Sequence, residues 1–258
     1  MPIVAAAVLP HTPLLIPGVG KDHGELLTLT KRSIAEVVEM GYAAKPDLMV
    51  VLTPHHETIT DTIVVNVAER YHGGFAEFGD MSTVVTARGA VGYSHQLKTV
   101  AEQEHVSLVL HTYSELDYGT SVPLTFVLSP LPNVPVLPVI LPFQQTDILL
   151  RAGMVLYDFL QAISARSMII ASCDMSRRSD RTPGVQRRPT TEERALSQAI
   201  VAVDPAPAIA ITPHPTTCGF GPLVTLLSVI HPIAQHGTIL SFEAPLGVGL
   251  LTAIFTLR

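Results

Sequence analysis

Two histidines at the ends of apolar segments are the residues best suited to chemistry. His11 follows the apolar run Ile3 to Leu9, His55 follows the run Leu48 to Leu52, and a proline stands directly before each histidine. If both runs are strands of one open sheet, the loops after them lie at the same edge, where ligands of such sheets bind. Imidazole is a common ligand of Fe, Zn and Cu, so the pair predicts a shared metal site. The alternative is that each histidine only ends a turn.

An acid and a thiol stand in two further segments of the same kind. Asp174 follows a third apolar run, where it could orient a metal-bound histidine through the free ring nitrogen or simply cap a turn. Cys218 precedes an apolar helical segment, and the dipole at a helix N-terminus favours the thiolate, which is the form that binds metal. A buried, inert cysteine is the competing interpretation.

Short apolar runs alternate along the chain with amphipathic segments, which predicts an α/β domain whose sheet is covered on both faces. Strands are expected at 3–9, 48–52, 62–67, 106–110, 136–141, 168–171, 237–242 and 248–255. Helices are expected at 24–40, 95–104, 146–164, 192–203 and 221–230. Thr190 and Glu193 fit a capping box at the start of one helix. The arginine-rich segment from Arg177 to Arg194 is expected to be an exposed loop, either a lid over the site or a plain solvated connection.

The composition limits the classes of function. The chain has 258 residues, 47% of them hydrophobic and 15% charged, which suits one domain over residues 1–258. A formal net charge of −6 without a basic run argues against nucleic acid and anionic membranes as partners. Two cysteines and no apolar run long enough for a membrane span predict a cytoplasmic protein. The mean hydropathy of +0.38 is high, so we expect a homo-oligomer that hides apolar surface.

Six short motifs, in the same order along the chain, resemble those of the class III extradiol ring-cleavage dioxygenases of the LigB-like type and their Memo-type relatives. They are Pro10-His11-x-Pro-Leu, Thr53-Pro54-His55-His56, Leu116-Asp117-x-Gly119-Thr120-x-Val122-Pro123-Leu124, Ser172-x-Asp174-x-Ser176, Cys218-Gly219 and Ser241 to Gly249. The resemblance implies a three-layer α/β/α sandwich with a mostly parallel or mixed central sheet. It also implies a non-haem Fe(II) ion held by two histidines and a carboxylate, with His11 and His55 as the histidines. The implied substrates are O₂ and a catechol or aminophenol-like ring, and some members need a companion subunit.

Two departures from the family pattern affect proton transfer. The chain has Tyr118 where many members have the histidine of Asp-His-Gly, and Arg177 where they have the catalytic histidine after Ser176. A guanidinium stays protonated, so Arg177 can stabilise an anion but cannot take a proton from a phenol. Tyr118 can still donate to bound oxygen, and His214, four residues before Cys218, could supply the base.

The third metal ligand is the most open part of the prediction. Memo-type proteins carry a cysteine in a similar Cys-Gly context, so Cys218 is expected to complete a His₂Cys site, which would also suit Zn or Cu. Glu243 is the fallback carboxylate. The motif positions further predict that His56, Thr120 and Phe220 line the substrate pocket.

Two functions follow from these residues. The first is a non-haem Fe(II)-dependent extradiol dioxygenase acting on a catechol or aminophenol-like aromatic. The second is a Memo-like metal-binding or redox protein, or a non-catalytic subunit, that keeps the pocket without ring cleavage.

Overall fold

The computed structural model describes all residues except 1, 56–61, 144, 178–186 and 212–216. The strands are β1 (Ile3–Leu9), β2 (Leu48–Thr53), β3 (Ile63–Asn66), β4 (Arg70–Phe75), β5 (Asp80–Arg88), β6 (Leu108–His111), β7 (Val136–Ile140), β8 (Ser167–Ser172), β9 (Asp174–Arg177), β10 (Ala234–Glu243) and β11 (Val248–Leu257). The α-helices are α1 (Pro17–Gly20), α2 (Thr28–Ala44), α3 (Val91–Gln103), α4 (Tyr118–Val127), α5 (Thr146–Ala162), α6 (Thr191–Ala202), α7 (Ala206–Ile209) and α8 (Phe220–Ile230).

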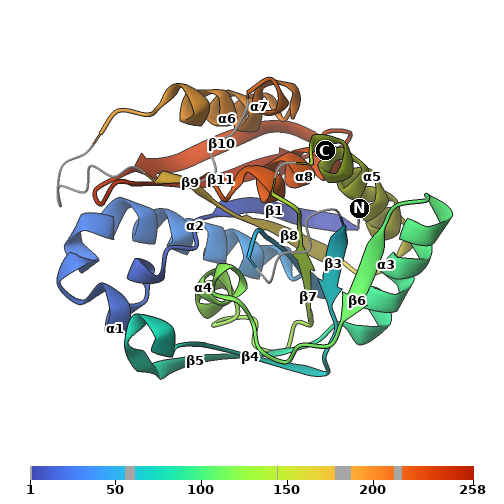
Figure 1. Cartoon of the computed structure of the whole chain (residues 1–258), viewed down its shortest axis with the longest axis horizontal. Coiled ribbons are helices and arrows are strands. Elements are labelled where there is room, and N and C mark those ends of the chain that lie inside the picture. Colours follow the sequence, from blue (N-terminus) through green and yellow to red (C-terminus); the bar gives the residue numbers. More distant parts are fainter. Residues whose placement is uncertain (1, 56–61, 144, 178–186, 212–216) are drawn as a thin grey trace.

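Within the described residues, nine strands form one mixed sheet in the order β10-β11-β1-β8-β2-β7-β3-β6, with β9 pairing β11 (Figure 1). The four central strands β1, β8, β2 and β7 are parallel. In a parallel arrangement the carboxyl ends of neighbouring strands meet at one edge of the sheet. The loops after β1, β8 and β2 therefore lie side by side, which brings the first three predicted site segments together.

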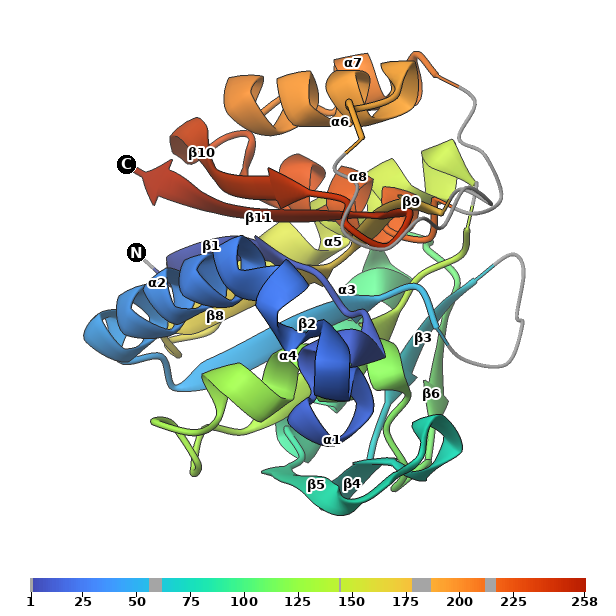
Figure 2. The ribbon, with the colours of Figure 1, turned by 90° about the vertical axis from the view of Figure 1, so that its left-hand side faces the viewer.

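Helices cover both faces of the sheet, as the sequence predicts, and the fold is a three-layer α/β/α sandwich. Side chains alternate along β2, so Val50 belongs to the hydrophobic core shared with α3, α5, α6 and α8, whereas Val51 belongs to the core shared with α2 and α4. Figure 2 shows α2 and α4 on one side of the sheet and α5 and α8 on the other. Among the described residues, no helix is both long and apolar enough to cross a lipid bilayer.

Several elements are absent from the predicted set, namely β4, β5, β9, α4 and the four-residue helices α1 and α7. Strands β4 and β5 form a hairpin outside the main sheet. The alternation of apolar and polar residues in β4 is interrupted because one of its buried positions is Gly73, against which Ser121 packs closely. Helix α4 is almost wholly buried and contains Pro123, so it shows no amphipathic period. Strand β9 is a four-residue segment that begins at Asp174 and pairs with β11. Such short or uniformly apolar segments carry no periodic signal.

The predicted capping box at the start of α6 is confirmed. The Thr190 hydroxyl accepts from the backbone of Glu193, and the Glu193 carboxylate accepts from the backbone of Thr190. The same carboxylate is buried and makes an ion pair with Arg187, so this arginine is anchored in the fold, whereas the neighbouring Arg188 is exposed as expected. Residues 178–186 of the predicted loop lie outside the described residues.

Candidate metal centre

Two backbone hydrogen bonds fix the loops that carry the histidines. His11 lies two residues beyond β1, and its backbone N–H donates to Oδ1 of Asp174 at 3.0 Å. His55 lies two residues beyond β2, and its backbone N–H donates to Oγ1 of Thr53 at 3.3 Å. The His11 loop is thus held by the first residue of β9, and the His55 loop is held by the last residue of β2.

The side chains of His11, His55 and Cys218 converge. Nε2 of His55 lies 3.0 Å from Nε2 of His11, and Sγ of Cys218 lies 3.3 Å from the same nitrogen. The three candidate ligand atoms all lie within 4.8 Å of one another. His11 is fully buried, whereas His55 and Cys218 are partly exposed, so the group opens to one side. The sequence predicted these three residues as ligands, and the structure brings all three together.

This geometry fits a single transition-metal ion. Bonds of about 2.0–2.1 Å to nitrogen and 2.3 Å to sulfur at tetrahedral angles separate the ligand atoms by about 3.3–3.6 Å. The two separations from Nε2 of His11, 3.0 and 3.3 Å, are slightly shorter than these values, and the distance from His55 to Cys218 is at most 4.8 Å. Two imidazoles and a thiolate form a soft donor set that suits Zn, Cu or a strongly donating Fe.

The second ring nitrogen of His11 has a partner that sequence reasoning missed. Nδ1 of His11 lies 3.0 Å from Oγ of Ser172, the last residue of β8. Asp174, which the sequence predicted for this role, holds the backbone of His11, and its Oδ2 lies 3.8 Å from Nε2 on the metal-binding side of the ring. Ser172 belongs to a motif noted in the sequence, yet only the register of β8 between β1 and β2 places its side chain under His11.

Tyr118 supports His55 from the start of α4. Its hydroxyl lies 3.4 Å from Nδ1 of His55, and the two rings lie 4.3 Å apart between centroids. Asp117 caps α4 by accepting from the backbone and hydroxyl of Thr120, and it also accepts from the hydroxyl of Thr53. The Thr120 hydroxyl predicted to line the pocket is thus engaged in the helix cap.

The two cysteines have different surroundings. Cys218 precedes Gly219, the N-cap of α8, and is partly exposed. Cys173 is fully buried and donates to the carbonyl oxygen of Gly219. Burial raises the pKa of the Cys173 thiol well above its ordinary value, and the nearby charges of Cys218 and Asp174 raise it further. Among the described residues, the group of converging ligand atoms includes Cys218 and not Cys173.

The remaining predicted residues lie elsewhere or outside the described atoms. Glu243 is buried and accepts from both the backbone N–H and the hydroxyl of Thr30, so it caps α2 instead of joining the histidines. Phe220 is buried in the core shared with α5. His56, His214 and the side chain of Arg177 lie outside what the structure describes.

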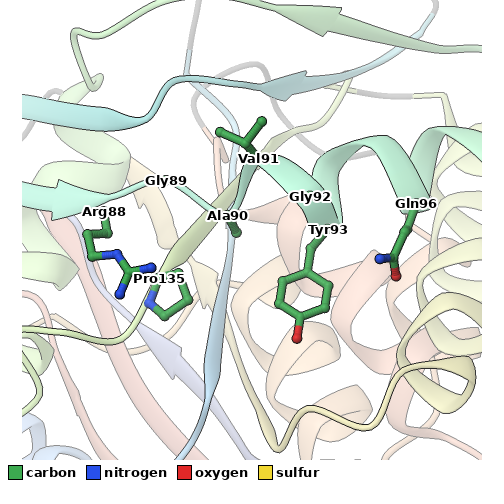
Figure 3. A pocket seen from close by; sticks show the side chains of 8 residues that line it. All are labelled: Arg88, Gly89, Ala90, Val91, Gly92, Tyr93, Gln96 and Pro135. Carbon is green, nitrogen blue, oxygen red and sulfur yellow. The ribbon is translucent and has the colours of Figure 1, made fainter.

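A surface cavity of about 300 Å³ lies apart from this group (Figure 3). It is formed by the end of β5, the first turn of α3 and Pro135, with Arg88, Tyr93 and Gln96 as its longest polar side chains. None of the residues that line it belongs to the predicted site.

Comparisons with known proteins identify the family. Residues 5–192, which are 188 of the 258 residues, match the family described as the catalytic LigB subunit of aromatic ring-opening dioxygenase. The matched segment contains His11 and His55 and ends before Cys218.

One curated relative and one solved structure add to this match. The Clostridium acetobutylicum protein CA_C1420 is 21% identical to this chain, and the match covers 94% of the chain and 55% of the relative. The chain therefore spans about half the length of that relative. A crystal structure of the uncharacterized protein JW3007 from Escherichia coli K12 superposes with a TM-score of 0.67 at 14% identity, covering 97% of this chain and 99% of that one, a likeness of fold alone. By the extent of the family match, the chain belongs to the family of LigB-type catalytic subunits of aromatic ring-opening dioxygenases.

Proposed function

We propose that His11, His55 and Cys218 hold one transition-metal ion and that the protein uses it, as Fe(II), to open a catechol or aminophenol-like ring with O₂. The observation that supports this proposal is the convergence of the three ligand atoms within 4.8 Å at the carboxyl edge of the parallel strands. Membership of the LigB family supplies the reaction class. When bound, such a metal would act as a Lewis acid toward the substrate oxygens and would carry electrons between the ring and O₂.

The protein's own groups would handle the protons. Opening of the ring beside its oxygens requires that the substrate hydroxyls lose protons, a task that Arg177 cannot perform because its guanidinium stays protonated. The hydroxyl of Tyr118 at His55 and the carboxylate of Asp174 at His11 are polar groups beside the ligand atoms. Tyr118 can donate a hydrogen bond from Oη to a substrate oxygen, and Asp174 can accept one from a hydroxyl held near Nε2 of His11.

A second candidate is a metal-binding or redox protein that does not cleave rings. The observation that favours it is the thiol at the third ligand position, because thiolate donors select Zn or Cu over the hard carboxylate-bound metals. The replacement of the family histidine by Arg177 points the same way. A non-catalytic subunit with the same pocket is a variant of this candidate.

The deciding experiment is anaerobic purification with elemental analysis, followed by Fe(II) reconstitution and assays of O₂ uptake and product colour with catechols and 2-aminophenols. One equivalent of iron with turnover would establish the dioxygenase. Zinc or copper at one equivalent, with no turnover after reconstitution, would establish the second candidate. A protein that binds no metal under any of these conditions would overturn both.

Substitutions test the ligand set directly. His11→Ala and His55→Ala should each lower the amount of bound metal at least about tenfold, whereas His95→Ala, an exposed histidine on α3, should leave it unchanged. Cys218→Ser should also lower it, whereas Cys173→Ala, the only other cysteine in the sequence, should not. If Cys218→Ser retains full metal, the third ligand is a different residue.

The assembly of the protein is a separate part of the proposal. The predicted homo-oligomer and a companion subunit, as some family members need, would appear in sedimentation velocity as species heavier than the 27.7 kDa chain. If the protein is a monomer and cleaves the substrate without any other protein, neither the homo-oligomer nor the companion subunit is needed.

A further inference from the structure

The hydroxyl of Ser172 bridges a histidine ring and a backbone carbonyl group. Oγ lies 3.0 Å from Nδ1 of His11, and it donates a short hydrogen bond to the backbone carbonyl oxygen of Gly119. Ser172 is fully buried at the end of β8, between β1 and β2. Its hydroxyl is therefore held by the sheet on one side and by the first turn of α4 on the other.

The number of protons decides the direction of both hydrogen bonds. A serine hydroxyl has one proton, and a carbonyl oxygen can only accept, so that proton lies toward Gly119. Oγ must then accept from Nδ1 of His11, which places a proton on Nδ1. A neutral imidazole carries one N–H, so Nε2 of His11 keeps its lone pair.

The neighbours of Nε2 agree with this assignment. Nε2 of His55 at 3.0 Å and Sγ of Cys218 at 3.3 Å can each donate a proton toward the lone pair when no metal is bound. Oδ2 of Asp174, which would favour a proton on Nε2, lies at 3.8 Å, beyond hydrogen-bond distance. Two groups that can donate a proton therefore lie beside Nε2, whereas the neighbour of Nδ1, Oγ of Ser172, accepts.

We propose that Ser172 is a positioning residue that fixes the tautomer of His11 with a proton on Nδ1, so that Nε2 is ready to bind metal before any metal arrives. The tautomer itself does not depend on the proposed function, but its purpose rests on the proposed metal centre. A ligand that is already in the binding tautomer avoids the rearrangement that a freely tautomerising imidazole needs. Removing a hydrogen-bond partner of the non-ligating ring nitrogen typically weakens metal affinity about 10–100-fold.

The hydrogen-bond chain also connects the two histidines through α4. Gly119 accepts from Ser172, and the adjacent Tyr118 lies 3.4 Å through its hydroxyl from Nδ1 of His55. The first turn of α4 thus reaches Nδ1 of His55 directly through Tyr118 and Nδ1 of His11 indirectly through Ser172. The backbone carbonyl of Gly119 cannot be removed by substitution, so the hydroxyl of Ser172 is the point at which the chain can be tested.

The test is a long-range ¹H–¹⁵N correlation spectrum of the metal-free protein, labelled with ¹⁵N-histidine, at pH 8, where ordinary histidines are neutral. Comparison with His11→Gln assigns the His11 signals among the 11 histidines. We expect Nδ1 of His11 to carry the proton in the wild type. Ser172→Ala should shift the population toward Nε2–H, and its dissociation constant for Zn²⁺ or Co²⁺ should rise about 10–100-fold.

Two further variants separate this role from a loss of packing. Ser172→Thr keeps the hydroxyl and should keep the wild-type tautomer. Ser176→Ala removes a buried hydroxyl that contacts Glu193 and should change neither the tautomer nor the metal affinity. Both are compared with Ser172→Ala by thermal unfolding.

A proton on Nε2 of His11 in the wild-type spectrum would overturn the proposal, whether or not any variant folds. An unchanged tautomer in Ser172→Ala would overturn it as well. If the wild type binds no metal but shows Nδ1–H, the tautomer assignment stands and the proposed metal centre fails. The two results are thus distinguishable.

Discussion

Gly119 lies so close to His55 that a β-carbon at position 119 would stand 2.8 Å from Cδ2 of the histidine ring. The same β-carbon would stand 2.6 Å from Oγ1 of Thr53 and 2.8 Å from Oδ1 of Asp117. Real β-carbons essentially never approach other atoms so closely, so the ring can occupy its place only because residue 119 has no side chain. Packing therefore requires glycine at this position of the proposed metal centre.

Gly119→Ala should therefore displace His55 and weaken metal binding at least about tenfold, with the fold retained. Isothermal titration with Zn²⁺ measures the affinity, and circular dichroism checks the fold. The matched control is Gly92→Ala in the first turn of α3, where a β-carbon meets no atom within 4 Å. Equal affinities in the two variants would show that the position of His55 does not limit binding.

Glu243→Ala should destabilise the protein without releasing metal. The variant leaves the buried N–H and hydroxyl of Thr30 without their acceptor at the start of α2, which costs about 1–3 kcal/mol. Urea unfolding measures the loss of stability, and elemental analysis measures the metal. Loss of metal at unchanged stability would instead show that Glu243 is a metal ligand, which is the alternative that the sequence analysis gave for this carboxylate.

Arg187→Met should destabilise the protein by about 3–5 kcal/mol, because it leaves the carboxylate of Glu193 buried without its partner. The ion pair is bidentate, with two N–O distances of 2.6 Å, and the Glu193 side chain is fully buried. The surface pair Arg32–Glu36 provides the control, since Arg32→Met removes a contact between side chains that are 81% and 51% exposed. That change should cost less than about 1 kcal/mol, and similar losses in the two variants would contradict the buried role of Arg187.

The same ion pair predicts a pH dependence. Burial by itself raises the pKa of Glu193, but hydrogen bonds from Arg187, Ser176 and the backbone of Thr190 outweigh it and hold that pKa below its ordinary value. Because the folded-state pKa is lowered, the contribution to stability is present above the unfolded pKa of about 4.3 and is lost as pH falls through the folded-state value.

In Arg187→Met, burial dominates and raises the Glu193 pKa, so the stability difference between wild type and variant should shrink as pH falls. Urea unfolding of both proteins between pH 7 and the lowest pH at which they fold measures this difference. A difference that stays constant across the range would show that Glu193 does not titrate with the pair.

A thiol-alkylating reagent at neutral pH should label Cys218 and spare Cys173 in the native protein. Cys218 is partly exposed, whereas the Cys173 thiol is fully buried and its pKa is raised, so it offers no thiolate to the reagent. Peptide mass spectrometry measures both sites, and the denatured protein, in which both react, is the control. Added Zn²⁺ should slow labelling at Cys218, and labelling that is indifferent to metal would argue against Cys218 as a ligand.

The sequence alone determined much of the fold because its signals are local. Apolar runs such as Ile3–Leu9, and the Thr190–Glu193 capping box, mark elements that the structure confirms with bounds within a few residues. Helix α4 was not predicted because it is buried on nearly all sides and so has no amphipathic period. The hairpin β4–β5 was not predicted because a glycine occupies one of the buried positions of β4, which interrupts the alternation of apolar and polar residues.

For the candidate site, too, some features could be predicted from local sequence and others could not. That His11 and His55 follow strands, and that Cys218 precedes a helix, can be predicted from neighbouring residues in the sequence. Which polar groups meet these side chains depends on the order and register of strands that are distant in the sequence. Leu9 pairs with Ser172 and Leu52 with Ala171, and this register places a serine under His11 and turns Asp174 toward its backbone. Only the tertiary structure decided those contacts, because hydrogen bonds between residues about 160 positions apart leave no periodic trace in the chain.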